Sequence, residues 1–119
     1  MSKQKIYNII PGEMIQDDNT MKKIEELINS IQFTDWEEIN EDVYSKGILI
    51  NNNEFYVMYI DPWGDIKRLF ITARDQIMRF MKERINYEHG DGVDMVICNK
   101  DISNAIVCNH DGQVYELKK

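Results

Sequence analysis

Two amphipathic stretches, each followed by strand-like sequence, constrain the fold of this chain more than any other feature. In the first stretch, Asp18, Asn19 and Thr20 are candidate helix caps, and the apolar residues after them are spaced three and four apart. That apolar stripe consists of Met21, Ile24, Leu27, Ile28 and Ile31. The spacing predicts an amphipathic helix whose opposite side carries charged residues.

The second amphipathic stretch begins at Thr72 and Asp75, whose spacing is similar to that of a capping box. The apolar stripe after them consists of Ile77, Phe80, Met81 and Ile85. It predicts a second long helix that runs to about residue 87.

Thr34 and Glu37 also have capping-box spacing. They predict a short helical turn between the two long helices, carrying Trp36 and Ile39. We expect Trp36 to lie in the core.

The segments around the second helix are rich in β-branched and aromatic residues. ILI at 48–50 and FYVMYI at 55–60 flank the polar residues NNNE at 51–54, which predicts a hairpin because Asn tolerates the left-handed conformation of tight turns. DPWGD at 61–65 is a second predicted turn, since Pro presets φ and Gly accepts positive φ. It leads into a third predicted strand, KRLFI at 67–71.

The dipeptide Asp111-Gly112 is the strongest short hairpin signal in the chain. A two-residue loop there pairs His110 with Gln113, and this register places Cys108 opposite Tyr115. The tail after the second helix therefore predicts two or three more strands. The alternation of apolar residues in it places Cys98 and Cys108 together on one buried face.

Both cysteines are thus predicted to be reduced, buried and without metal. A zinc site is disfavoured because Cys98, Cys108 and His110 form C-x9-C-x-H, which lacks the paired ligands of zinc sites. A dyad of Cys108 and His110 is conceivable because residues two apart share a strand face. An activated thiol needs an electropositive, accessible setting, however, and this one is apolar with Asp111 beside it.

The order of helix, strands, helix, strands predicts an α+β fold: a mostly antiparallel sheet of about five to six strands packed with two main helices. At 119 residues, the chain 1–119 is expected to form a single domain. No apolar run approaches the roughly 20 residues that span a bilayer. The start of the chain has no signal-peptide pattern, and two cysteines do not imply a disulfide framework, so we expect a cytoplasmic protein.

The charge is acidic, with a formal net value of -7. An acidic surface repels the phosphates that supply most nucleic-acid affinity, so direct DNA or RNA binding is disfavoured and a basic protein partner is favoured. The basic residues between 67 and 84 are explained by ordinary solvated faces and i, i+4 pairs.

Two acidic clusters each surround a tryptophan, and neither has the spacing of a Ca²⁺ loop. Trp63 lies at the tip of a predicted tight turn, where a large aromatic has little core to enter, so we interpret it as a binding anchor. The carboxylates of both clusters are interpreted as partner-binding residues. They are Asp61 and Asp65 around Trp63, and Asp35, Glu37, Glu38, Glu41 and Asp42 around Trp36.

No motif assembles a nucleophile, a base and oxyanion donors, and no phosphate loop, G-x-S-x-G or HExxH is present. We therefore expect no enzyme activity, no catalytic residue and no cofactor.

The strand EFYVMYID, the helix after it and the closing hairpin AIVCNHDGQVYEL, within residues 43–117, resemble the cognate immunity proteins of bacterial polymorphic and contact-dependent toxin systems. The resemblance implies a non-catalytic inhibitor that binds one toxin domain, often a basic nuclease, in the producing cell. The alternative is a small-molecule-binding or accessory module of a larger bacterial system.

Overall fold

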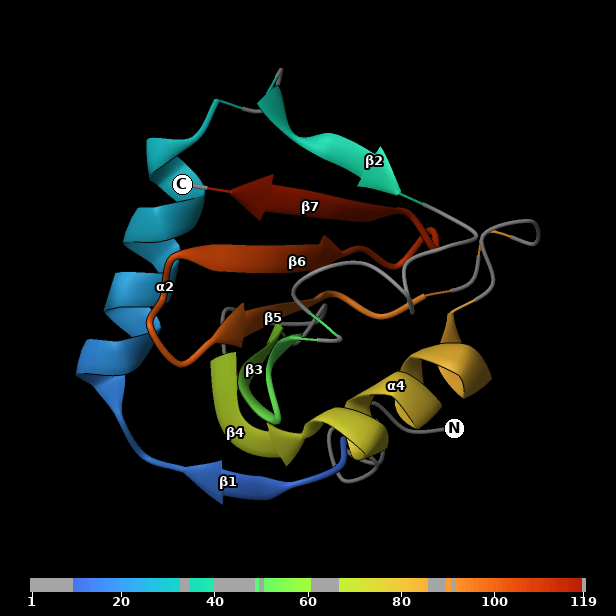
Figure 1. Cartoon of the computed structure of the whole chain (residues 1–119), viewed down its shortest axis with the longest axis horizontal. Coiled ribbons are helices and arrows are strands. Elements are labelled where there is room, and N and C mark those ends of the chain that lie inside the picture. The colour runs from blue at the N-terminus through green and yellow to red at the C-terminus, as the bar shows by residue number, and fades with distance from the viewer. Residues whose placement is uncertain are drawn as a thin grey trace.

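The computed structural model of the chain describes most of its length. The described residues are 10–32, 35–39, 49, 51–60, 67–85, 90 and 92–118. They form one antiparallel sheet of seven strands in the order β1-β4-β3-β5-β6-β7-β2, together with two helices (Figure 1). The predicted α+β class is confirmed. The strand count exceeds the expected five to six because both edges of the sheet are strands of only three residues.

Strands β1 and β2 form the two edges, and in the centre β3 lies between β4 and β5. Their bounds are β1 Glu13–Ile15, β2 Glu37–Ile39, β3 Glu54–Ile60, β4 Lys67–Ala73, β5 Met95–Asn99, β6 Asn104–Cys108 and β7 Val114–Lys118. All five residues of β5 are buried, which fits a strand covered on both faces. The strands predicted at 55–60 and 67–71 are confirmed as the antiparallel pair β3 and β4.

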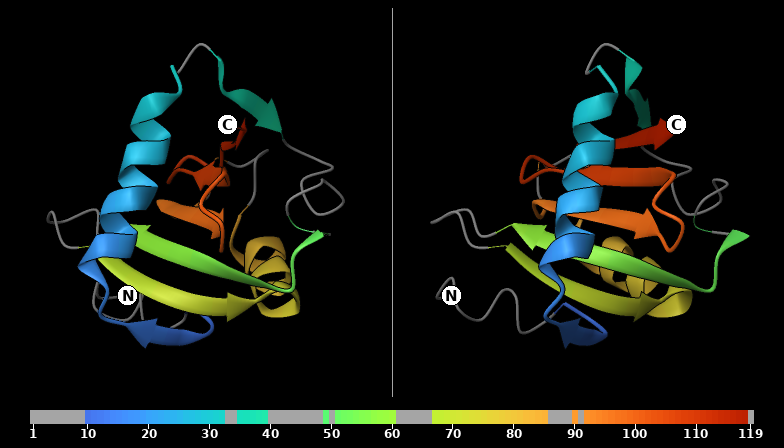
Figure 2. Two further views of the ribbon diagram at one scale, coloured as in Figure 1. Left: turned by 60° about the vertical axis from the view of Figure 1, so that its left-hand side comes forward. Right: turned by 90° about the vertical axis from the view of Figure 1, so that its left-hand side faces the viewer.

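Helix α2, Asp18–Ser30, covers one face of the sheet (Figure 2). Its buried residues Ile24 and Leu27 pack against Met58, Leu69 and other side chains of that face, as the apolar stripe predicts. The cap is Asp17 rather than one of residues 18–20. Its carboxylate accepts hydrogen bonds from the backbone N of Thr20 at 3.0 Å and from the Thr20 hydroxyl at 2.7 Å.

Helix α4, Arg74–Arg84, packs on the opposite face. Its buried side chains Ile77, Phe80 and Met81 belong to the larger of the two core clusters, and Ile85 packs against the same cluster. The helix starts one residue later than a cap at Thr72 requires, because Ala73 is its N-cap. Thr72 instead lies fully buried in β4, where its hydroxyl donates a hydrogen bond of 2.7 Å to the carbonyl of Pro11.

The edge strand β1 lies close to β4 because Gly12 precedes it. Gly12 has φ +106°, and a Cβ at this position would lie 2.3 Å from the carbonyl oxygen of Ile71. A side chain there would thus be strained and would also clash with the neighbouring strand. Together with the Thr72–Pro11 hydrogen bond, this glycine holds the start of β1 against the sheet.

Two local predictions between the helices are wrong. Residues Glu37–Ile39 form the strand β2, paired with β7, and not a helical turn. The hairpin predicted from ILI at 48–50 is also wrong, because β3 already pairs with β4 on one side and with β5 on the other. Leu49 is helical and fully buried, although most of the segment around it lies outside the described residues.

The hairpin of β6 and β7 exists, but its predicted register is wrong by one residue. Cys108 pairs with Val114, and the backbone N of Asn109 donates to the carbonyl of Gln113 at 3.1 Å. The loop therefore has three residues, His110 to Gly112, and ends on Gly112 with φ +80°. Three-residue hairpin loops of this kind consist of a type I turn followed by a residue in the left-handed conformation.

The two cysteines lie on opposite faces of the sheet, and not together as predicted. Met95 pairs with Cys108, so β5 and β6 have an odd register sum. Cys98 packs in the cluster under α2, whereas Cys108 packs in the cluster under α4. Both are free and buried, as predicted.

Candidate functional site

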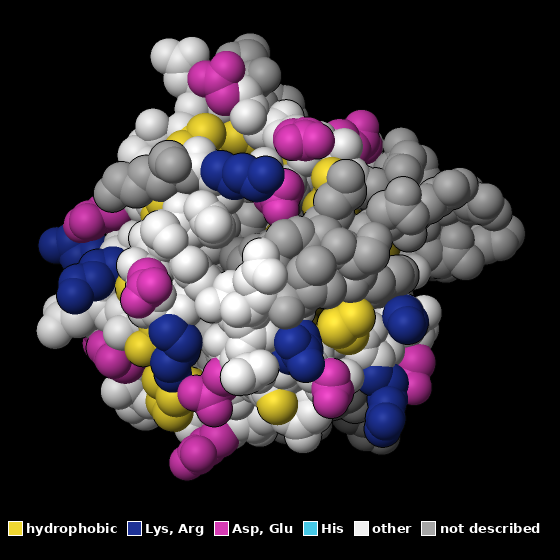
Figure 3. Space-filling model, viewed as in Figure 1, with side chains coloured by type: hydrophobic (Ala, Val, Ile, Leu, Met, Phe, Trp, Pro, Cys, Tyr) yellow, Lys and Arg dark blue, Asp and Glu magenta, His cyan; other side chains and the backbone are white. Residues whose placement is uncertain are grey.

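The acidic edge strand β2 brings together the described members of the predicted partner surface. Asp35, Glu37 and Glu38 are all exposed. In the space-filling view, acidic side chains gather over β2 at the upper rim of the molecule (Figure 3). These three carboxylates therefore lie at one end of the sheet, where no other described strand follows β2.

Trp36 fixes the start of this edge. Its indole Nε1 donates a hydrogen bond of 3.1 Å to the carbonyl of Ile31, at the end of α2. Its ring lies 5.8 Å from the ring of Tyr115 on β7, at an interplanar angle of 59°, which is a favourable tilted arrangement. Trp36 is half-buried, so it joins helix, edge strand and sheet instead of filling the core as predicted.

A buried carboxylate lies beside this edge and is paired with a lysine. Glu116 on β7 is only 5% exposed and lies opposite Glu37. Lys118, two residues along the same strand face, places its Nζ 3.3 Å from Glu116 Oε1. Lys118 therefore compensates the charge of Glu116 and reduces its repulsion with Glu37. The exposed carboxylates of the edge are those of Asp35, Glu37 and Glu38.

The other predicted site residues cannot be placed on this surface. Trp63, Asp61 and Asp65 lie outside the described residues, and so do Glu41 and Asp42. The assignment of Trp63 as an anchor stays a prediction.

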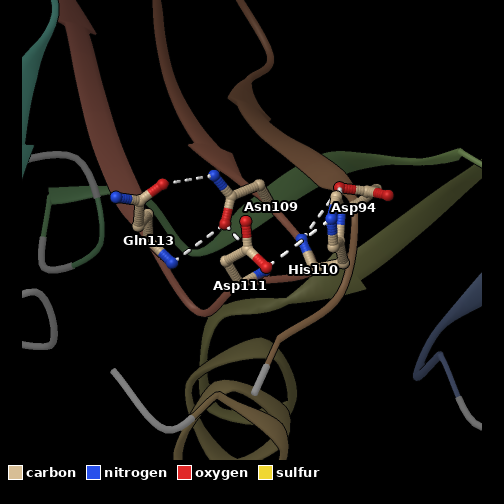
Figure 4. Close-up of polar contacts among 5 residues, drawn as sticks. All are labelled: Asp94, Asn109, His110, Asp111 and Gln113. Carbon is tan, nitrogen blue, oxygen red and sulfur yellow. Dashed lines mark hydrogen bonds and ion pairs between the residues drawn. The ribbon is translucent and has the colours of Figure 1, made fainter. Parts of the chain in front are cut away.

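Polar side chains cluster at the β6–β7 loop (Figure 4). Asp94 Oδ1 accepts a hydrogen bond of 2.9 Å from the backbone N of His110 and lies 3.3 Å from its Nδ1. The other ring nitrogen, Nε2, lies 3.6 Å from a carboxylate oxygen of Asp111. Each imidazole nitrogen thus faces a carboxylate. His110, whose side chain is 70% exposed, lies within the three-residue loop and is not paired with Gln113 as predicted.

Asn109, in the same cluster, stabilises the turn with its side-chain hydrogen bonds. Its Oδ1 accepts from the backbone N of Asp111 and from that of Gln113, both at 3.0 Å, while its Nδ2 donates to Gln113 Oε1 at 2.9 Å. Side chains of this kind stabilise tight turns. These hydrogen bonds hold the loop in its conformation, and none of them activates a nucleophile.

The nearby thiol is unsuited to catalysis. Burial, together with the charge of Asp94, raises the pKa of Cys108 to about 12, and burial raises the pKa of Cys98 to about 12. A thiol with so high a pKa is protonated at neutral pH and is a poor nucleophile. Among the described residues, no group of three or more His, Cys, Asp or Glu side chains is placed to hold a metal ion.

The opposite edge of the sheet contains a hollow that sequence reasoning missed. It has a volume of about 390 Å³ and lies where β1 ends, between the start of α2 and the start of β4. Its lining includes Met14, which is 51% exposed. The three residues of β1 are too few to show the alternation by which a strand is recognised in a sequence.

Comparison of the chain with protein-family models, with curated proteins and with solved structures finds no match. In the part of the chain that the structure describes, neither helix has the length and apolar character needed to cross a membrane.

Proposed function

We propose that this chain is an immunity-type inhibitor that binds and neutralises a cognate bacterial toxin domain, with a basic nuclease as the favoured class of toxin. The observation that carries the proposal is the acidic edge strand β2, where Asp35, Glu37 and Glu38 are exposed next to the buried Glu116. The inhibitor acts in the cytoplasm of the producing cell and has no catalytic activity of its own.

Electrostatics supports this pairing. A nuclease needs a basic surface to hold phosphates, so an acidic inhibitor can cover that surface and reach it rapidly. The net charge of -7 supplies the long-range attraction, and the β2 edge supplies a place where carboxylates are concentrated. Exposed charges of this kind act mainly on the association rate.

The proposed interface also includes the predicted residues outside the described part of the chain. Trp63 serves as the apolar anchor, and Asp61, Asp65, Glu41 and Asp42 extend the acidic field. Truncation of a buried aromatic anchor acts mainly on dissociation, and Trp63→Ala is expected to cost about 2 kcal/mol or more of binding free energy.

The test is binding kinetics against the product of the neighbouring gene, measured at several salt concentrations. The double variant Glu37→Lys/Glu38→Lys is expected to slow association at least about tenfold at low salt and to weaken its salt dependence. The matched control is Glu13→Lys/Glu83→Lys, which makes the same change in net charge at exposed positions on β1 and α4.

Equal effects of the two double variants would show that only net charge matters and that the β2 edge is not the interface. Absence of any complex would contradict the inhibitor proposal. A screen for esterase, phosphatase and nuclease turnover tests the non-catalytic part, which fails if a single change at His110 or Cys108 abolishes a measured activity.

The alternative function, a small-molecule-binding module, is favoured by one observation, the hollow at the β1 end of the sheet. Its volume of about 390 Å³ falls within the range of small-ligand sites. A ligand that fills it would raise the melting temperature of the isolated chain.

A further inference from the structure

The chain contains two Asp-Gly dipeptides, Asp91-Gly92 and Asp111-Gly112. Aspartate isomerises most readily when glycine follows it, because glycine has no side chain to hinder the approach of its backbone nitrogen to the aspartate carboxyl group. Asp91 lies outside the described residues, whereas Asp111 and Gly112 both lie within them, in the β6–β7 loop. The structure therefore shows what surrounds the reacting atoms of the second dipeptide.

The reaction is intramolecular. The backbone nitrogen of Gly112 attacks Cγ of the Asp111 carboxylic acid, a C–N bond forms, and a C–O bond of the carboxyl group breaks. The amide hydrogen and the hydroxyl group leave together as water. Water then opens the resulting succinimide ring: opening at Cγ restores aspartate, and opening at the backbone carbonyl gives isoaspartate, in which the chain runs through Cβ and Cγ. Solvent water is the only co-reactant.

In the folded loop the carboxyl group is accessible and the attacking nitrogen is not. The side chain of Asp111 is 66% exposed. Gly112 is buried, and its backbone N donates a hydrogen bond of 3.1 Å to the carbonyl of Asn109. Gly92 packs against the same atom, since a Cβ on Gly92 would lie 2.7 Å from the nitrogen of Gly112. This nitrogen therefore has to break its hydrogen bond and leave Gly92 before it can reach the carboxyl group.

The peptide units on both sides of the dipeptide are held as well. Every backbone N–H of the loop, and of the residue on each side of it, donates a hydrogen bond. Those of Asp111 and Gln113 both donate to Asn109 Oδ1, at 3.0 Å each, and that of His110 donates to Asp94 Oδ1. Figure 4 shows Asn109 between Asp111 and Gln113. Its side chain thus fixes the backbone before and after the reacting bond.

We propose that Asp111-Gly112 is a site of spontaneous isoaspartate formation, that Asn109 holds it unreactive in the folded chain, and that the modification prevents the hairpin from closing again. Isoaspartate lengthens the backbone of the three-residue loop by a methylene group, so the hydrogen bonds around Asn109 cannot all be kept. Strand β2 pairs with β7, the second strand of this hairpin, so the modified chain also loses the acidic edge.

The test incubates the full chain, folded and in denaturing urea, at mildly acidic pH. Trypsin cleaves after Lys100, so the two Asp-Gly dipeptides fall in separate peptides, and 101–118 contains Asp111. Mass spectrometry with electron-transfer fragmentation distinguishes isoaspartate from aspartate. Isoaspartate in 101–118 is expected to form at least about tenfold more slowly in the folded chain, where it requires local opening. Asp111→Glu should abolish it, which separates Asp111 from Asp101 in the same peptide.

Asn109→Ala is expected to speed isoaspartate formation in the folded chain at least about fivefold, because it removes both hydrogen bonds to Oδ1. The matched control is Asn99→Ala. The side chain of Asn99 stabilises the β5–β6 turn in the same way, accepting from the backbone N of Ser103 at 2.9 Å and of Asn104 at 3.1 Å. This variant should leave the rate unchanged. Equal acceleration by both variants would show that the reaction follows general destabilisation, and it overturns the role of Asn109.

The isoaspartate chain, separated by chromatography and returned to native buffer, is then compared with the unmodified chain by amide hydrogen exchange. Loss of protection is expected in β7 and β2. Native protection in both strands overturns the proposal, and so do equal rates in the folded and urea-denatured chain or absence of isoaspartate in urea. None of these measurements involves a partner protein, so their outcome is independent of the inhibitor proposal.

Discussion

The two faces of the sheet are covered by helices that are stabilised in different ways. Helix α2 has a side-chain cap, because Asp17 accepts two hydrogen bonds from Thr20, and it has no basic residue in its last turn. Helix α4 has Ala73 at its N-cap, which has no side-chain acceptor, but Asp75 in its first turn and two basic residues in its last turn complement the helix dipole. The start of α2 is therefore fixed by its own sequence, whereas α4 follows directly from β4 and depends more on packing.

The cores under the two helices differ as well. The cluster under α4 is the larger one and is built almost entirely of buried side chains, while half-buried residues surround the cluster under α2. A cavity close to half-buried side chains can collapse more completely than one enclosed by a dense core. The difference indicates that the α4 face carries more of the stability and that the α2 face tolerates more change.

The largest expected effect comes from a matched pair of core truncations. Ile77→Ala under α4 and Ile24→Ala under α2 each remove the side chain of a fully buried isoleucine. Both should lower the free energy of unfolding by about 2–5 kcal/mol, with the Ile77 variant the more destabilised by about 1 kcal/mol. Urea denaturation monitored by tryptophan fluorescence measures both. Equal losses would show that the two cores are equally rigid.

The two buried cysteines, one on each face of the sheet, predict a loss of stability at alkaline pH. Both thiols have a pKa raised to about 12 in the folded chain, against 9.0 in the unfolded one. Their contribution to stability is therefore complete below pH 9 and is lost as the pH rises from 9 toward 12, by about 1.4 kcal/mol per pH unit for Cys108. Unfolding curves of Cys108→Ala should lose this part of the pH dependence.

The substitution Asp94→Asn is expected to change the pKa of one thiol and not that of the other. The charge of Asp94 contributes to the raised pKa of Cys108 and is not a cause of that of Cys98. The substitution should lower only the pKa of Cys108, and by less than the full shift because burial is the larger cause. Thiolate absorbance of the single-cysteine variants shows whether the effect is confined to one face.

The cap of α2 predicts a pH dependence at the acidic end. Hydrogen bonds from the side chain and then from the backbone of Thr20 lower the pKa of Asp17 from its ordinary value of 3.8. A lowered pKa stabilises the fold above the unfolded pKa, and this stabilisation is lost as the pH falls through the folded one. Asp17→Asn should keep the cap and lose the pH dependence, while Asp17→Ala should lose both. Gln76→Ala on α4 removes the acceptor of a 3.4 Å hydrogen bond from the backbone N of Ala73, and it should leave the pH dependence unchanged because Gln76 carries no charge.

The smallest expected effect is at Ile102, which packs against the α2 face with φ +53°. A β-branched residue in the left-handed region is strained. Glycine relieves that strain, so Ile102→Gly should be more stable than Ile102→Ala by roughly 1 kcal/mol, the reverse of the usual order. If alanine is the better tolerated of the two, the strain at this position is negligible.

Residue spacing predicts the elements with strong periodicity. Both helices, the pair of β3 and β4 and the existence of the β6–β7 hairpin are confirmed, and so is the burial of both thiols. In these segments the apolar residues that define the pattern are also the ones that pack in the core, so local sequence and tertiary structure agree.

Register and short strands could not be predicted in the same way. The turn signal Asp111-Gly112 fits a loop of two or three residues, and the hydrogen bonds of Asn109 favour the longer one. That single residue places Val114 rather than Tyr115 opposite Cys108 and so exchanges the faces of β7. Cys98 and Cys108 are separated by a different register, the pairing of Met95 with Cys108 between β5 and β6. Strand β2 was missed because it is stabilised by pairing with β7, which lies far away in the sequence. The local sequence around β2 contains a capping-box pattern and gives no indication of that pairing.

The place of β2 in the sheet also determines when the proposed inhibitor surface can exist during synthesis. Glu37 is translated well before the strand beside it, Val114–Lys118. Until then the nascent chain has no strand to which β2 can pair, and long-range pairings of this kind form slowly. A cell that depends on this edge is therefore protected only by chains that have been translated to the end of β7, and not by incomplete ones.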